Sequence, residues 1–269
     1  LTHLDLSNTG WEINSSINNL TNLVYLKLDG NAGGNLDISN LSKLEFLSCR
    51  NSGLNSIHVN NLSKLKELRL EGNALTALDL TGVSGLEVLS VQGNKLATLD
   101  VTPCSGLTVL QADNNELANL NVSGLASLIQ LDCQNNQLEQ INVNGLSALQ
   151  QLNVSNNKLI ELNISGLTNL ETVLAANNEL AGEWNAGDVD VVSLEGNQIT
   201  ALKEGSADIS YLNIRGNQLT ELQLTSTELT KVYCSDNNLE SLTMASESLE
   251  SVYCDNNKLP YLETAGAVD

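Results

Sequence analysis

Residues 128–143, LIQLDCQNNQLEQINV, decide the fold of this 269-residue chain. They place apolar residues at fixed offsets with one asparagine among them: Leu128, Leu131, Cys133, Asn136, Leu138, Ile141 and Val143. The same pattern returns 21 residues later, over residues 149–164, and 21 residues earlier, over residues 107–122. A fixed period of this kind indicates a chain built from stacked copies of one structural unit.

The consensus L-x-x-L-x-L-x-x-N-x-L with a period of roughly 20–29 residues is the leucine-rich-repeat signature. Thirteen repeat starts follow from it: Leu1, Leu23, Leu44, Leu65, Leu86, Leu107, Leu128, Leu149, Leu170, Val189, Ile209, Leu229 and Leu249. The sequence therefore predicts a β-rich, α/β-class leucine-rich-repeat solenoid of about 13 coils. Because each coil packs only on its neighbours, we expect residues 1–269 to form a single solenoid domain.

Side chains alternate across a strand, so repeat positions 4 and 6 should face the core and positions 3, 5 and 7 should face outward. We expect these strands to form a curved parallel sheet on the concave face. A second apolar pair, such as Leu99 with Val101, would line the opposite, convex wall. No long helical period occurs there, which predicts short strands, turns or 3₁₀ segments.

The repeat length changes once along the chain. Residues 1–180 follow mostly 21-residue repeats, residues 189–269 mostly 20-residue repeats, and residues 181–188 break the register. Glu183 and Asn185 stand there where apolar residues are expected, and Trp184 could fill the gap. We interpret the break as a change of back-wall geometry, with a small functional loop as the alternative.

Asparagine occupies position 9 in eleven of the thirteen units. Its amide can donate to and accept from buried backbone groups at a turn, so we expect a structural asparagine ladder. The five cysteines, Cys49, Cys104, Cys133, Cys234 and Cys254, form no C-x-x-C pair and have no histidine beside them. They are predicted to be buried, reduced thiols rather than metal ligands or nucleophiles.

The runs LDCQNNQL, VYCSDNNL and LNVSNNKL resemble the 21-residue cysteine-ladder repeats of internalin J-type bacterial surface proteins. The resemblance covers nearly the whole chain. It implies a secreted or wall-attached adhesin, and hence an extracellular or cell-surface location in a bacterium. The chain opens inside a repeat without a methionine, so we expect it to be a piece of a longer protein.

Composition narrows the possible partners. The formal net charge is −20, with 32 acidic and 12 basic residues, which argues against nucleic acid and anionic membrane surfaces as partners. No apolar run is long enough to insert in a membrane. No D-x-D-x-D-G loop offers a calcium site, and no cofactor or metal is predicted.

The exposed strand positions carry most of the aromatic residues and several cations. We predict ligand-binding residues at both ends of the concave face: Tyr25, Lys27, Phe46, Arg50 and Arg69 near the amino terminus, and Tyr211, Arg215, Lys231, Tyr233 and Tyr253 near the carboxyl terminus. Exposed aromatic residues beside arginine are typical of binding hot spots. Tyrosine and phenylalanine also favour strands, so part of this enrichment is expected without function.

The sequence favours a non-enzymatic recognition module that binds a protein, as a monomer, at a bacterial surface. A catalytic site needs a pocket with a positioned base and nucleophile. The chain has only two histidines, His3 and His58, with no suitable partner near either. A glycan-binding module is the first alternative, supported by the tyrosines, and a structural spacer in a larger surface protein is the second.

Overall fold

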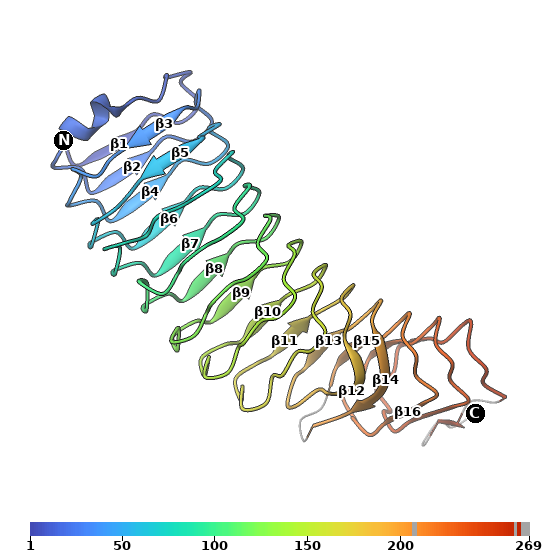
Figure 1. Cartoon of the computed structure of the whole chain (residues 1–269). Helices are drawn as coiled ribbons and strands as arrows, with labels where there is room; N and C mark the ends of the chain where they lie inside the picture. The colour runs from blue at the N-terminus through green and yellow to red at the C-terminus, as the bar shows by residue number, and fades with distance from the viewer. Residues whose placement is uncertain (206–208, 261–262, 265–269) are drawn as a thin grey trace. The chain divides into compact units, whose positions relative to one another are not determined.

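The computed structural model describes residues 1–205, 209–260 and 263–264. The chain divides into two compact units, residues 1–149 and residues 150–269, which we call the first and second units. Each unit is a stack of short coils in which every coil contributes one strand to a parallel sheet (Figure 1).

The large-sheet strands confirm the predicted repeat. In the first unit they are, in spatial order, β1 (His3–Asp5), β2 (Tyr25–Lys27), β4 (Phe46–Ser48), β6 (Glu67–Arg69), β7 (Val88–Ser90), β8 (Val109–Gln111) and β9 (Gln130–Asp132). In the second unit they are β10 (Gln151–Asn153), β11 (Thr172–Leu174), β13 (Val191–Ser193), β15 (Tyr211–Asn213), β17 (Lys231–Tyr233) and β19 (Ser251–Tyr253). Each strand begins two residues after one of the predicted starts.

The opposite wall of each unit is built from short pieces, as predicted. The first unit has a 3₁₀ helix, η1 (Ser15–Asn19), and the paired strands β3 (Asn35–Asp37) and β5 (Ser56–His58). In the second unit β12 (Ala181–Asn185) pairs with β14 (Gln198–Lys203), and β16 (Glu221–Leu224), β18 (Ser241–Met244) and β20 (Glu263–Thr264) form a second small sheet. Among the described residues, no helix combines the length and apolar character that a membrane crossing requires.

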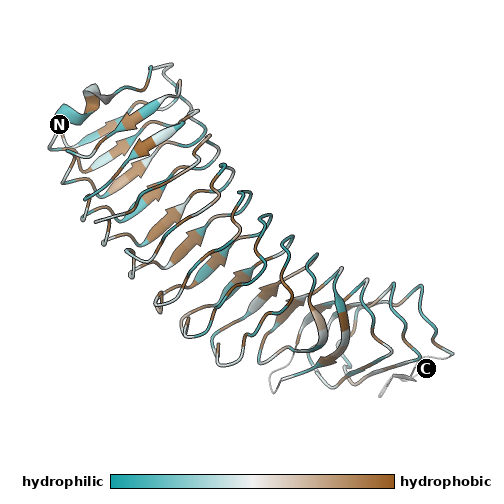
Figure 2. Cartoon of the chain, in the orientation of Figure 1, coloured by the Kyte–Doolittle hydropathy of each residue, from teal (hydrophilic) through white to brown (hydrophobic). Residues whose placement is uncertain are grey.

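The core lies between the two walls. The middle residue of each large-sheet strand points inward, and Leu47, Leu68 and Val232 have no exposed surface. In Figure 2, brown, apolar segments recur on the strands of successive coils. Full burial of a leucine contributes roughly 1.5–3 kcal/mol relative to its exposed state, so the periodic leucines supply the main stabilisation of each coil.

A two-residue turn follows each large-sheet strand. Its first residue is left-handed and is Asn, Gly or Asp, as at Asn114 (φ 55°) and Gly72 (φ 68°). Glycine is required at position 72 for a second reason, because an added Cβ would lie 2.1 Å from Oδ1 of Asn51 in the preceding coil. The sequence prediction identified the asparagine that follows this residue and did not identify the left-handed residue itself.

The asparagine ladder is confirmed as structural. Asn94 donates through Nδ2 to the carbonyls of Leu70 and Val91, both at 2.9 Å, and its Oδ1 accepts from the Leu75 backbone N–H at 3.1 Å. Ser52 replaces asparagine in the third coil, and its hydroxyl still donates to the Leu28 carbonyl at 2.9 Å. The ladder therefore satisfies backbone groups that the turns leave without partners.

All five cysteines are free. Four are buried, as predicted, whereas Cys254 is only half-buried. Burial raises the pKa of Cys104 to about 11 and that of Cys234 to about 12, so these thiols are poor nucleophiles at neutral pH.

The pairing of β12 with β14 shifts register between Gly182 and Glu183, where Thr200 of β14 is the extra, unpaired residue. Trp184 lies in this irregular segment and is only 5% exposed, so its side chain fills the back wall of the second unit. Its indole Nε1 has no hydrogen-bond partner.

Candidate functional site

The strand face of each unit is the outer surface of its large sheet. Its side chains come from the first and third residues of each strand, and from the residue two positions further along. In the second unit these rows include Tyr211, Asn213 and Arg215 on one coil and Lys231, Tyr233 and Ser235 on the next. Most strand-face side chains are half-buried, because each one packs against the equivalent residues of neighbouring coils.

Three tyrosines form a continuous stack on the strand face of the second unit. Tyr233 and Tyr253 are register partners in β17 and β19, and their ring centroids lie 4.8 Å apart with an interplanar angle of 3°. Tyr211 lies diagonal to Tyr233, at 5.7 Å and 45°. The coil spacing of about 4.8 Å matches the preferred separation of stacked rings, so the fold itself builds the stack.

Tyr253 ends the stack and is 49% exposed, whereas Tyr211 and Tyr233 are half-buried. Burial, with Tyr233 and Glu195 nearby, raises the pKa of Tyr211 above its usual value. The phenol group of Tyr211 therefore stays neutral at physiological pH.

An ion pair lies beside the stack. Arg215 Nε donates to Asp236 Oδ2 at 2.8 Å, and Asn256 Nδ2 donates to Asp236 Oδ1 at 2.7 Å. The hydrogen bonds from Asn256 and Arg215 lower the pKa of Asp236. Lys231 is the register partner of Tyr211 and is half-buried beside it. The structure thus brings the five predicted residues of this region together on three neighbouring coils.

A second aromatic stack occupies the strand face of the first unit. The rings of Tyr25 and Phe46 lie 4.5 Å apart at 5°, and His3 stacks on Tyr25 at 5.9 Å and 20°. All three residues are the first residue of their strand, so they form one straight column.

The predicted cations of the first unit are held by acidic neighbours. Arg50 donates to Asp29 Oδ2 from Nε at 3.1 Å and from Nη2 at 2.9 Å, and Lys27 Nζ lies 3.7 Å from the same oxygen. Ser48 Oγ and the Arg50 backbone N–H donate to Asp29 Oδ1 at 2.5 and 2.8 Å. Burial raises the pKa of Asp29, but these hydrogen bonds outweigh it and leave the pKa below its usual value. Arg69 pairs with Glu67 in its own strand.

The sequence prediction named the aromatic and basic members of both regions and omitted their acidic partners. Asp29 and Asp236 each lie 21 residues from the arginine they bind. An acid one repeat from an arginine (Asp29) or one residue beyond one repeat (Asp236) was the available signal, because residues about one repeat apart lie on neighbouring coils.

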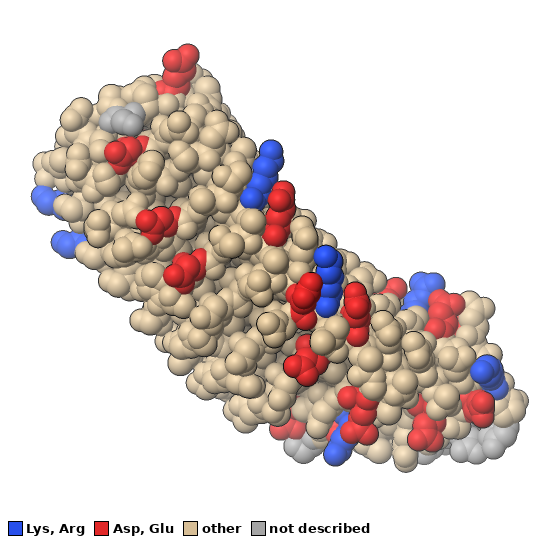
Figure 3. All heavy atoms as spheres, viewed as in Figure 1, with Lys and Arg blue, Asp and Glu red and all other residues tan. Residues whose placement is uncertain are grey.

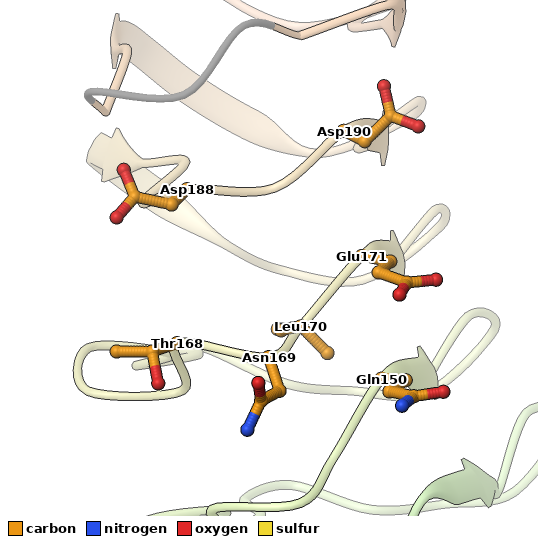
Figure 4. Close-up of a pocket in the computed structure, with 7 residues that line it drawn as sticks. All are labelled: Gln150, Thr168, Asn169, Leu170, Glu171, Asp188 and Asp190. Atoms are coloured by element: carbon orange, nitrogen blue, oxygen red, sulfur yellow. The ribbon is translucent and has the colours of Figure 1, made fainter.

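A shallow hollow of about 250 Å³ lies in the second unit, lined by Gln150, Thr168, Asn169, Leu170, Glu171, Asp188 and Asp190. In Figure 4, Glu171 and Gln150 project from the same side of successive coils, whereas Asp188 projects to the other side. Its acidic side chains do not converge on one point, so the hollow offers no constellation of catalytic acid and base.

On the face that Figure 3 shows, the basic side chains are scattered and form no continuous tract, and acidic side chains outnumber them. In the described part of the chain, no group of three or more His, Cys, Asp or Glu side chains is placed to hold a metal ion. The aromatic stacks with their adjoining ion pairs are therefore the best candidates for recognition.

A repeat solenoid with a parallel sheet on one wall and an asparagine ladder defines the leucine-rich-repeat class. The Leucine Rich Repeat family profile matches residues 148–170. No curated protein matches the chain in sequence.

Solved structures show the same fold over nearly all of the chain. The leucine-rich-repeat protein LIC12759 of Leptospira interrogans is 25% identical, with a TM-score of 0.82 over 97% of this chain and 74% of that one. The leucine-rich effector protein YopM of Yersinia pestis is 26% identical, with a TM-score of 0.82 over 97% and 73%. The functional domain of internalin J from Listeria monocytogenes, which includes a cysteine ladder, is 26% identical, with a TM-score of 0.71 over 91% and 58%. The chain thus has a leucine-rich-repeat fold and resembles bacterial leucine-rich-repeat proteins.

Proposed function

We propose that this protein is a non-enzymatic recognition module that binds a protein ligand through the strand face of its second unit, at a bacterial cell surface or in the extracellular space. The observation that carries the proposal is the stack of Tyr211, Tyr233 and Tyr253 beside the Arg215–Asp236 pair. Tyrosine and arginine are among the residues most enriched in binding hot spots. The leucine-rich-repeat fold itself is a framework for protein binding, and similarity to internalin J supports the location.

The ring geometry favours a protein over a sugar. A sugar that stacks on an aromatic residue needs a free ring face. Tyr233 and Tyr253 cover one face of each other at 4.8 Å, so only Tyr253, at the end of the stack, keeps an exposed outer face. Their edges and hydroxyl groups remain available for apolar contacts and hydrogen bonds with a peptide or a protein loop. Because the strands hold these side chains before binding, little ordering entropy is lost when a ligand docks.

The test is a binding screen of the wild-type protein and of a Tyr211→Ala, Tyr233→Ala, Tyr253→Ala variant against a displayed peptide library and a glycan array. Loss of a hot-spot side chain weakens binding by about 2 kcal/mol or more, so the triple variant should lose a peptide signal by at least about 30-fold. Ile160→Ala is the matched control, because Ile160 is exposed (64%) in the same unit but lies outside the strand face. Melting curves establish that all variants remain folded.

A peptide signal that the triple variant loses and Ile160→Ala retains would support the proposal. A tyrosine-dependent signal on the glycan array alone would favour the sugar-binding alternative. Peptide binding that survives the triple substitution would exclude this surface as the binding site, and absence of any signal would favour a structural spacer.

A further inference from the structure

The strand face of the second unit carries one pair of tyrosines that lie face to face. Tyr233 and Tyr253 are register partners in β17 and β19, with ring centroids 4.8 Å apart and an interplanar angle of 3°. The coil repeat relates the two side chains almost by a translation, so each atom of one ring lies about one coil spacing from its counterpart on the other. The ortho carbons beside the two hydroxyl groups are therefore neighbours.

The other tyrosines that the structure describes have no such partner. Tyr211 is tilted by 45° from Tyr233 at 5.7 Å, because it is the first residue of its strand whereas Tyr233 is the third. Tyr25 stacks on Phe46, which has no hydroxyl group. Among the described residues, Tyr233 and Tyr253 are thus the one pair of parallel phenol rings.

An oxidant can reach this pair from its exposed end. Tyr253 is 49% exposed and Tyr233 is half-buried, so the outer ring is the more accessible of the two. Stacked rings at this separation exchange an electron readily, so a radical formed on Tyr253 can be passed to Tyr233. The adjacent residues Cys234 and Cys254 project to the opposite side of their strands, because side chains alternate along a strand. Neither thiol therefore lies between the two rings.

We propose that Tyr233 and Tyr253 are a site of oxidative cross-linking, at which hydrogen peroxide, acting through a haem peroxidase, joins the two rings as dityrosine. Each phenol loses one electron and one proton to give a tyrosyl radical, and the peroxide gains both electrons and both protons to become two water molecules. One ortho carbon of each ring then forms a carbon–carbon bond with the other. The hydrogen on each bonded carbon moves through water to the phenol oxygen, which restores both aromatic rings.

The fold favours coupling within this pair over coupling between protein molecules. The two strands hold the rings side by side before oxidation, so the effective concentration of the second ring is far above that of another molecule in dilute solution. The ortho carbons must approach from about 4.8 Å to bonding distance. Rotation of partly exposed side chains on the picosecond-to-nanosecond timescale supplies this movement. The sheet therefore acts as a template for the bond.

The bond would join β17 to β19 covalently. These strands are otherwise held by backbone hydrogen bonds, such as that from the Cys234 N–H to the Tyr253 carbonyl at 2.8 Å. A cross-link restricts the unfolded chain, as a disulfide does, but a carbon–carbon bond is not cleaved by thiol reductants. We therefore expect the linked protein to melt several degrees higher than the unlinked one. This inference goes beyond the proposed function, because the reaction needs no ligand.

The test exposes the full chain, in dilute solution, to hydrogen peroxide and a haem peroxidase. The monomer is then isolated, reduced, alkylated and digested with trypsin. No lysine or arginine lies between residues 232 and 257, so both tyrosines fall in the single tryptic peptide 232–258. This peptide should lose the mass of two hydrogen atoms and show the blue fluorescence of dityrosine. A disulfide between Cys234 and Cys254 would cause the same mass change, but reduction would reverse it.

Variants test the role of the ring geometry. Tyr253→Phe keeps the stacked ring and removes one phenol, so it should abolish the link, whereas Tyr211→Phe removes a phenol outside the pair and should leave the link in place. Phe46→Tyr installs a second pair of parallel phenols, because the Tyr25 and Phe46 rings lie 4.5 Å apart at 5°. It should form a second link, in the first unit, under the same conditions. Melting curves taken before oxidation establish that the variants are folded.

A linked peptide 232–258 in the wild-type monomer that is absent from Tyr253→Phe would support the inference. A wild-type monomer whose tyrosines are oxidised without a link in this peptide would overturn it, as would dityrosine found only between protein molecules. A link that persists in Tyr253→Phe, or a Phe46→Tyr variant with no second link, would contradict the geometric argument. None of these outcomes depends on a ligand, so failure here leaves the proposed function to its own test.

Discussion

The first unit stacks His3, Tyr25 and Phe46 in one straight column, whereas the second unit steps diagonally from Tyr211 to Tyr233 before Tyr253 completes the stack. The charged groups beside them also differ. Asp29 is 8% exposed and receives hydrogen bonds from Ser48 and Arg50. The side chains of Arg215 and Asp236 are 54% and 34% exposed.

The same stacked-strand geometry therefore supports two different arrangements of side chains on the strand face. In the first unit, side chains on the strand face bind one another and form a nearly closed network. In the second unit, Tyr253 and the Arg215–Asp236 ion pair are exposed to solvent. Exposed aromatic and arginine side chains are typical of docking surfaces. In the first unit, two buried oxygens of this network, on Glu71 and Gln92, have no hydrogen-bond partner. The second unit instead has a broad aromatic surface.

The largest expected effect concerns a feature that the two units share. Asn94→Ala in the first unit and Asn178→Ala in the second should each destabilise the protein by about 3–5 kcal/mol, because several buried backbone groups lose their partners together. Asn178 donates to the Val154 and Ala175 carbonyls at 3.0 and 3.1 Å and accepts from the Leu159 N–H at 3.0 Å. Urea unfolding of both variants measures the costs, and clearly unequal costs would show that the ladder is not equivalent in the two units.

The second prediction tests the contrast between the two charged regions. Asp29→Ala should cost about 2 kcal/mol of unfolding free energy, because it leaves Arg50 and the Ser48 hydroxyl without their acceptor. Asp236→Ala should cost much less, since its partners are exposed to water. Thermal unfolding of the two variants side by side gives the comparison. Equal costs would contradict the description of one network as closed and the other as open.

The smallest expected effect is the pH dependence of the stability that the Glu71 side chain contributes. Its pKa in the folded protein is raised above 4.5 by burial, so its contribution to stability is present below pH 4.5 and is lost as the pH rises through the folded pKa. Glu71→Gln cannot ionise and should therefore gain stability relative to wild type as the pH increases from 4 toward 7. Melting temperatures of both proteins across this range measure the difference, and a difference that stays constant would contradict a raised pKa.

Much of the fold could be predicted from the sequence because the repeat pattern occurs thirteen times. Strand starts, inward leucines and the asparagine ladder each depend on local offsets, which a sequence displays directly. The left-handed residue before each asparagine of the ladder is Asn, Gly or Asp in the sequence, but its role can be recognised only from the turn geometry. The half-burial of Cys254 depends on its neighbours in space, and no local pattern encodes it.

The candidate site was only partly predictable. Placing Tyr233 and Tyr253 at the same offset in neighbouring repeats was enough to predict their proximity, and the structure adds the parallel stacking. The binding of Arg215 to Asp236 and of Arg50 to Asp29 depends on side-chain reach across coils. The unpaired oxygens of Glu71 and Gln92 depend on packing in three dimensions, so sequence alone could not identify them.

The most direct measurement of the central claim is hydroxyl-radical footprinting of the tyrosines, with and without a peptide selected by the wild-type protein. We predict that Tyr211, Tyr233 and Tyr253 become protected on binding, with the greatest change at Tyr253 because it is the most exposed of the three. Ile160 should react equally in both states. Protection at other residues, with the three tyrosines unchanged, would contradict a binding surface on the strand face of the second unit.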